Sequence, residues 1–246
     1  MTGRAVESLL DAAGVGTGQA VLDLATGPGY VAAGARARGA VPTGVDVANA
    51  MVELARELHP GIEFIEANVA DLPFGDEWFD VVLGNFMILH VREPERAARE
   101  IVRVLRPGGF VALSSWNVPE RTAMFEVMLE AIAESGAQLP DDLPAGPPFF
   151  RFSDDAEFAR LLSGAGLELQ EVRTIEWRQS FPDGETVWEG MVGATVRTAS
   201  LVTSQNEEMQ QTIRAGFDAR IANFQTNDEV ELPTSVKIAS ARKASA

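Results

Sequence analysis

The sequence predicts an α/β fold built on a doubly wound, mostly parallel sheet of seven strands. Up to about Trp116, short apolar runs alternate with helix-like segments. These runs are apolar throughout, which is typical of parallel strands covered by helices on both faces. After Trp116, two long strand-like runs flank a helical stretch. This second half indicates an antiparallel pair at the sheet edge, with a helical cap between its strands.

The predicted strands are apolar or alternating runs that contain β-branched or aromatic residues. They are Ala20–Leu24, Val41–Val45, Ile62–Ile65, Phe79–Leu83, Phe110–Ser114, Leu167–Phe181 and Val230–Ala241. Helices are predicted between them, one with Pro94 in its first turn and one with Ser153 as its N-cap. They are Tyr30–Arg38, Ala48–Leu58, Pro94–Val104, Ala123–Glu134, Asp154–Ser163, Thr186–Val202 and Glu207–Phe224. Leu139–Phe150 is Pro-rich and is expected to be a loop.

Composition narrows the class of protein. With 246 residues and 46% apolar residues, the chain is expected to form a single domain over 1–246, with cap elements around 117–165 and 183–228. No apolar run of 18 residues predicts a membrane span. The absence of cysteine excludes disulfides and thiolate zinc sites and agrees with a cytoplasmic enzyme. Two separated histidines predict no metal site. A net charge of −16 disfavours nucleic acid as partner and favours a small molecule.

A glycine-containing turn follows the first predicted strand. Gly27-Pro28-Gly29-Tyr30-Val31-Ala32 satisfies the dinucleotide pattern G-x-G-x-x-G/A, and Asp46 follows Gly27 by 19 positions. An NAD(P)-dependent oxidoreductase is therefore one interpretation. Asp23, within the strand, argues against it, because an anion beside a pyrophosphate would repel it. A carboxylate there suits a cationic ligand.

The same stretch resembles motif I of class I S-adenosylmethionine (SAM)-dependent methyltransferases, whose form is acid-x-Gly/Ala-x-Gly-x-Gly. The resemblance continues through three later segments and covers about residues 9 to 116. These segments are Gly44–Val47, Phe64–Phe74 and Arg103–Gly109. The pattern is most similar to quinone-biosynthesis-like and other bacterial small-molecule methyltransferases. It implies a Rossmann-like methyltransferase fold and SAM as the cofactor.

The resemblance also implies which residues hold SAM. Asp46 would bind both ribose hydroxyls, and Met51 would lie near the adenine. Asn68 stands where the family commonly has Asp and would accept a hydrogen bond from the adenine amino group through its side-chain oxygen. Asn85 and Phe86, in the loop after the fourth strand, would meet the methionine part. The full set of expected contacts is Asp23, Ala25, Thr26, Gly27, Gly29, Asp46, Val47, Met51, Asn68, Val69, Asn85 and Phe86.

The expected reaction is methyl transfer to an O, N or C atom of a small-molecule acceptor, with release of S-adenosylhomocysteine; a role in secondary metabolism is one expectation. His90 is a candidate general base, although it could equally be a packed histidine that orients its neighbours. Alignment alone can supply much of the rate. A SAM-fold protein with a non-methylating role is a further alternative.

The acceptor pocket is expected to draw on aromatic and Met residues outside the first four strands, many of which would be ordinary core. They are Trp116, Phe125, Met128, Phe149, Phe150, Phe152, Trp177, Trp188, Met191 and Phe224. Only about twenty residues precede the first strand. The cover over the methionine end of SAM should therefore come from the C-terminal half, from a partner subunit in a homodimer, or from a segment outside this sequence.

Overall fold

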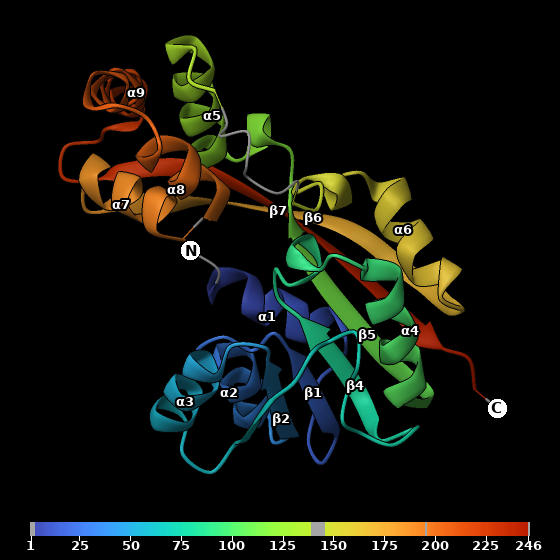
Figure 1. Ribbon diagram of the computed structural model, residues 1–246. Coiled ribbons are helices and arrows are strands. Elements are labelled where there is room, and N and C mark those ends of the chain that lie inside the picture. Colours follow the sequence, from blue (N-terminus) through green and yellow to red (C-terminus); the bar gives the residue numbers. More distant parts are fainter. Residues whose placement is uncertain (1–2, 139–145, 195, 246) are drawn as a thin grey trace. The chain divides into compact units, whose positions relative to one another are not determined.

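A computed structural model describes residues 3–138, 146–194 and 196–245 (Figure 1). The chain divides into two compact units. The first consists of Met1–Asn117, Gly146–Ile175 and Val236–Ala246, and the second of Val118–Ala145 and Glu176–Ser235. Most of the predicted loop Leu139–Phe150 lies outside the described residues. That residues 1–246 act as one domain with a cap stays a prediction.

The seven strands form one sheet in the order β3-β2-β1-β4-β5-β7-β6. The first five strands pair in parallel, and β7 pairs antiparallel with β5. The strands are β1 (Ala20–Leu24), β2 (Val41–Asp46), β3 (Glu63–Glu66), β4 (Phe79–Gly84), β5 (Leu105–Trp116), β6 (Leu167–Phe181) and β7 (Val230–Lys243). The predicted fold class is confirmed. The strand at the edge is β6, because β7 lies between β5 and β6.

The helices largely match the prediction. They are α2 (Tyr30–Ala37), α3 (Asn49–Leu58), α4 (Pro94–Val104), α5 (Ala123–Ser135), α6 (Asp155–Gly164), α7 (Gly184–Ala194), α8 (Val196–Thr203) and α9 (Glu207–Ile221). The predicted N-cap Ser153 is wrong by one residue, because Asp154 accepts the capping hydrogen bond from the Glu157 N–H at 2.9 Å. The range predicted as one helix, Thr186–Val202, is helical on both sides of Thr195, which lies outside the described residues. No helix in the described ranges has the length and apolarity that a membrane span requires.

One helix was not predicted. The helix α1 (Gly3–Ala12) precedes β1 and buries Ala5, Val6, Leu9 and Leu10 along one face. Arg173 of β6 donates a hydrogen bond to the Ser8 carbonyl at 2.7 Å, which ties the helix to the first unit. This spacing of apolar residues is the ordinary signal of an amphipathic helix.

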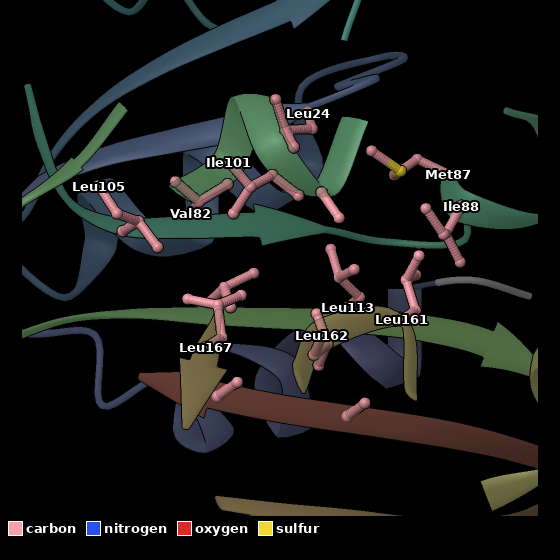
Figure 2. Close-up of a cluster of buried hydrophobic side chains, with 14 of the residues drawn as sticks. Leu24, Val82, Met87, Ile88, Ile101, Leu105, Leu113, Leu161, Leu162 and Leu167 are labelled. Atoms are coloured by element: carbon pink, nitrogen blue, oxygen red, sulfur yellow. The ribbon is translucent and has the colours of Figure 1, made fainter. Parts of the chain in front are cut away.

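The core of the first unit lies beside β4 and β5 (Figure 2). Ile101 of α4 faces Val82 of β4, and Leu162 of α6 lies near Leu113 of β5. All four side chains are fully buried. Each such side chain contributes about 1.5–3 kcal/mol of transfer free energy, so this packing holds β4 and β5 firmly in place.

The turn before the fifth strand appears as a bulge. Phe79 of β4 pairs with Leu105, but Val81 pairs with Phe110. The residues between, Arg106 to Gly109, are therefore extra to the ladder, and Gly108 has a φ of +78°. The turn predicted at Pro107–Gly109 is thus an irregularity inside β5.

Candidate cofactor-binding site

A cavity of about 560 Å³ lies at the carboxyl ends of β1, β2 and β4. Strand β1 has β2 on one side and β4 on the other, so the chain reverses its winding direction at this point. Open α/β sheets bind ligands at such switch points. Of the twelve expected cofactor contacts, ten line the cavity, and His90 lines it as well. Gly29 and Met51 are the two that do not.

Asp23 is almost completely buried, at 1% exposure. Its Oδ2 accepts hydrogen bonds from the Thr26 hydroxyl at 2.5 Å and from the Ala32 N–H at 3.1 Å. Burial raises the pKa of Asp23 to about 7, against the lowering effect of these two hydrogen bonds, and the nearby Asp46 raises it further. A cation placed beside it would favour the ionised form.

The turn between β1 and α2 has an unusual backbone. Ala25, Gly27 and Gly29 have φ values of +48°, +52° and +83°. At Gly29 a Cβ atom would come within 2.8 Å of the rings of Phe64 and His59. Gly29 therefore serves the close packing of the turn against its neighbours, whereas Ala25 and Gly27 line the cavity.

Asp46 joins the ends of β1 and β2. Its Oδ2 accepts a hydrogen bond from the Gly27 N–H and its Oδ1 accepts one from the Ala48 N–H, both at 2.9 Å. A carboxylate oxygen can accept more than one hydrogen bond, so Asp46 retains the capacity to bind a hydroxyl pair. The Asp46 carboxylate both shapes the turn and faces the cavity.

The residues expected at the adenine end of SAM do not all line the cavity. The Asn68 Oδ1 accepts a hydrogen bond from the Ala70 N–H at 2.9 Å, so its oxygen has one remaining acceptor site. Val47 lines the cavity and is 70% exposed. Met51 is 39% exposed and lies outside the cavity lining, so the structure gives it no contact with this space.

The loop after β4 contributes Asn85, Phe86 and Met87 to the wall. Phe86 has a φ of +56°, and its ring stacks on Trp116 with 4.2 Å between centroids. Ser114 of β5, which is not among the predicted contacts, reaches this loop through two hydrogen bonds.

His90 faces the same cavity, and its ring meets the edge of Phe149 with 5.8 Å between centroids. Partial burial lowers the pKa of His90 below its ordinary value. The imidazole is therefore mostly neutral at pH 7 and is able to accept a proton.

The expected acceptor-pocket residues divide into two groups. Trp116 and Phe149 reach the cavity indirectly, through Phe86 and His90. Others are core residues. Phe125, Met128, Phe152 and Met191 are at most 5% exposed, and Trp188 packs edge-to-face on Phe217.

The N-terminal segment forms a part of the cavity wall that was not predicted from the sequence. Gly3 and Val6, in the first turn of α1, line the cavity. The N-terminal segment thus supplies some of the cover that was expected from other parts of the chain or from a partner. No group of three or more His, Asp or Glu side chains suited to a metal occurs within the part of the chain that the structure describes.

Comparison with known proteins finds methyltransferases over part of the chain. Residues 22–113 match a family model described as a methyltransferase domain. A demethylmenaquinone methyltransferase from Clavibacter sepedonicus is 34% identical over 128 residues, which are 50% of this chain and 52% of that protein. One from Chlorobaculum tepidum is 36% identical over 110 residues, which are 44% and 46% of the two chains. The chain thus spans about half the length of the curated relatives it matches.

Solved structures share the fold over nearly the whole chain. A putative methyltransferase from Bacillus halodurans has a TM-score of 0.62 at 21% identity, with 98% of this chain and 100% of that chain covered. A 4+2-cyclase, SpnF, has a TM-score of 0.57 at 21% identity, with 99% and 82% covered. Identities this low establish the fold and leave the reaction open.

The strand order, the cavity at the switch point and the two carboxylates beside the Gly turn are those expected of a class I SAM-dependent methyltransferase domain. Residues 22–113 match the methyltransferase-domain family, and this part of the chain carries the strands and the turn that form the cavity. This confirms the family resemblance of the sequence.

Proposed function

We propose that the protein transfers the methyl group of SAM to a small-molecule acceptor and releases S-adenosylhomocysteine. The observation that carries this proposal is the pair of carboxylates, Asp23 and Asp46, that line the cavity around the Gly turn. Asp46 suits the ribose hydroxyls of either cofactor, but Asp23 lies beside the turn on which a dinucleotide would place its pyrophosphate, and its ionised form would repel that group. SAM instead presents a sulfonium and an ammonium, which favour ionised Asp23. This charge pattern favours SAM over NAD(P)H.

The cavity residues fit the parts of SAM. Asp46 would bind the ribose hydroxyls. Asn68 and Val69 lie where the adenine is expected, and Asp23, Asn85 and Phe86 lie where the methionine part is expected. The bound SAM supplies an activated methyl group. The remaining work is alignment of the acceptor with that group and removal of an acceptor proton, which we assign to the neutral imidazole of His90.

A small molecule as acceptor is supported by the charge of −16 and by the similarity to demethylmenaquinone methyltransferases. Demethylmenaquinone is therefore the first acceptor to test. A cytoplasmic location, a homodimer and a role in secondary metabolism stay predictions.

Calorimetry with SAM, S-adenosylhomocysteine, NADH and NADPH tests the cofactor. We expect binding of SAM and S-adenosylhomocysteine and no binding of the nicotinamides; binding of the nicotinamides alone would refute the proposal. Transfer of tritiated methyl groups to a panel that includes a demethylmenaquinone then tests the reaction. Mass spectrometry of the product would identify the methylated atom.

The fold shared with a 4+2-cyclase supports one alternative, a protein that uses the same pocket without methyl transfer. An acceptor converted in the presence of SAM, with no label incorporated and no S-adenosylhomocysteine formed, would favour that alternative.

A further inference from the structure

Ser114 lies on β5 and contacts two neighbouring residues of the cavity wall, both in the loop after β4. Its Oγ accepts a hydrogen bond from the Phe86 N–H at 2.9 Å and donates one to the Asn85 Oδ1 at 2.8 Å. Ser114 is fully buried and does not line the cavity. We propose that Ser114 is a positioning residue for ligand binding, acting through Asn85 and Phe86. This inference rests on the proposed function.

The first part of the argument is the backbone of Phe86. A φ of +56° is unfavourable for a bulky side chain and persists only where surrounding contacts enforce it. Two contacts do so here. The Phe86 N–H is fixed by Ser114, and the Phe86 ring stacks on Trp116 at an interplanar angle of 29°. Ser114 therefore stabilises the positive φ of Phe86, a loop conformation that would be unfavourable without this contact.

The second part concerns the orientation of the Asn85 amide. A serine hydroxyl has one proton, and a buried hydroxyl that donates to nothing costs free energy. Because Ser114 accepts from Phe86, its own proton goes to the Asn85 oxygen. This fixes the orientation of the amide, since an Asn85 turned by 180° would place its nitrogen beside Ser114 and leave the hydroxyl proton without an acceptor.

The consequence is a defined polarity for Asn85 at the cavity wall. With its oxygen held by the Ser114 hydroxyl, the Asn85 amide has a fixed orientation in which Nδ2 is its donor end. Such a donor suits a carboxylate or carbonyl oxygen, and the carboxylate of an amino-acid moiety is the group of this kind that SAM and S-adenosylhomocysteine carry. Ser114 thus sets both the backbone and the donor pattern of this wall.

The neighbouring Ser115 offers a matched control. It is also fully buried on β5, but its Oγ has no hydrogen-bond partner among the residues that the structure describes. Ser114→Ala and Ser115→Ala remove the same atom from adjacent positions of one strand. Only the first removes bonds to the cavity wall.

The experiment measures the Kd of S-adenosylhomocysteine by calorimetry for wild type, Ser114→Ala, Ser115→Ala, Asn85→Ala and the double variant Ser114→Ala/Asn85→Ala. We expect Ser114→Ala to raise the Kd about tenfold, equivalent to about 1.4 kcal/mol, and Ser115→Ala to leave it unchanged. In the Asn85→Ala background the effect of Ser114→Ala should be clearly smaller, because the two residues act together. Hydrogen exchange of the Phe86 amide should be faster in Ser114→Ala and unchanged in Ser115→Ala.

The outcomes separate the two proposals. If wild type binds and Ser114→Ala binds equally well, or if its effect is the same with and without Asn85, the role of Ser114 is refuted and the proposed function stands. If wild type binds neither SAM nor S-adenosylhomocysteine, both are refuted. Should Ser114→Ala not fold, Ser114→Cys preserves a weak donor of similar size. Its Kd is then expected to lie above that of wild type, and a Kd equal to wild type would count against the role.

Discussion

Thr26 donates its hydroxyl hydrogen to Asp23 across 2.5 Å, inside the turn that joins β1 to α2. Both side chains are buried, at 6% and 1% exposure. The donor therefore serves a carboxylate that water can hardly reach. The Thr26 hydroxyl also favours the charged form of Asp23. This one hydrogen bond therefore affects both the stability of the turn and the ionisation of Asp23.

Replacing Thr26 with valine keeps the shape of the side chain and removes this donor. We expect a loss of about 1–3 kcal/mol in the free energy of unfolding at pH 8, because a buried acceptor loses a partner. Urea denaturation measures it. Thr26→Ser, which retains the hydroxyl, is the control and should lose distinctly less; equal losses in the two variants would show that the hydrogen bond is unimportant.

The raised pKa of Asp23 predicts a pH dependence of stability. The folded protein binds a proton at Asp23 more tightly than the unfolded chain does, since the pKa rises from 3.8 to about 7. The contribution of this group to stability therefore falls as the pH rises from about 4 to 7. In Asp23→Asn that part of the slope should be absent from unfolding curves measured across this range.

The pKa of Asp80 is shifted in the opposite direction from that of Asp23, so Asp80 serves as a control for the pH dependence of stability. Burial alone would raise the pKa of Asp80, but hydrogen bonds from Arg106 and from the Ala20 N–H outweigh burial and lower it. Its stabilising effect is present above the unfolded value of 3.8 and is lost as the pH falls through the lower folded value. Asp80→Asn should therefore weaken the protein at neutral pH, and a gain in stability there would contradict this assignment.

Gly44 of β2 is expected to tolerate no side chain. A Cβ atom there would lie 2.5 Å from Phe64 Cδ1 and 2.8 Å from the Thr26 hydroxyl. We expect Gly44→Ala to cost about 1–3 kcal/mol, as overpacking of a core does, in thermal or urea unfolding. Gly190 of α7 is the control, because no atom of the described residues lies within 4 Å of the position that its Cβ atom would take. Gly190→Ala should stabilise by about 0.5–1 kcal/mol.

Arg103 of α4 fastens the segment that follows the expected adenine site. Its guanidinium donates to the Leu72 carbonyl at 3.0 Å and to the Phe74 carbonyl at 2.7 Å, and it also pairs with Glu100. A lysine ammonium cannot reproduce the planar set of N–H donors with which Arg103 reaches both carbonyls and Glu100. We therefore expect Arg103→Lys to lower the free energy of unfolding by about 1–3 kcal/mol. Arg96→Ala, which removes an exposed pair with Glu93 and a more distant charge near Glu100, should change stability by about 0.5 kcal/mol or less. Similar losses in both variants would refute the special role of Arg103.

The proposed role of His90 predicts how kcat depends on pH. If His90 removes the acceptor proton, kcat should fall as the pH drops through a pKa below 6.5, because the protonated ring cannot accept. His90→Gln should lower kcat by about 10²–10⁴-fold and abolish this limb of the profile, while the Kd of S-adenosylhomocysteine stays unchanged. An unchanged kcat would leave His90 as a packing residue.

Most of the sheet could be predicted because its strands are uniformly apolar and are separated by clear turns. The Gly turn, Asp23 and Asp46 carry their spacing in the sequence, so their meeting at one cavity was predictable from the fold. The helix α1 was missed although its buried positions follow a helical spacing and although Thr2, a residue type favoured at N-caps, precedes its first residue in the sequence.

Other features depend on distant packing. Ser114 meets Asn85 and Phe86 from 29 and 28 positions away, and a serine in a strand carries no local signal of such a role. The expected contact of Met51 failed to appear in the cavity because the position of a side chain on a helix depends on where the helix begins. Here α3 begins at Asn49, and Met51 is left partly exposed.

The place of β7 has a consequence for the order in which the protein can assemble. Strand β6 precedes β7 in the chain, yet β7 is the strand that separates it from β5 in the sheet. During synthesis, β6 leaves the ribosome before β7, its neighbour in the sheet, has been made. The backbone N–H and C=O groups of β6 that would pair with β7 are therefore hydrogen-bonded to water until Val230–Lys243 has been made.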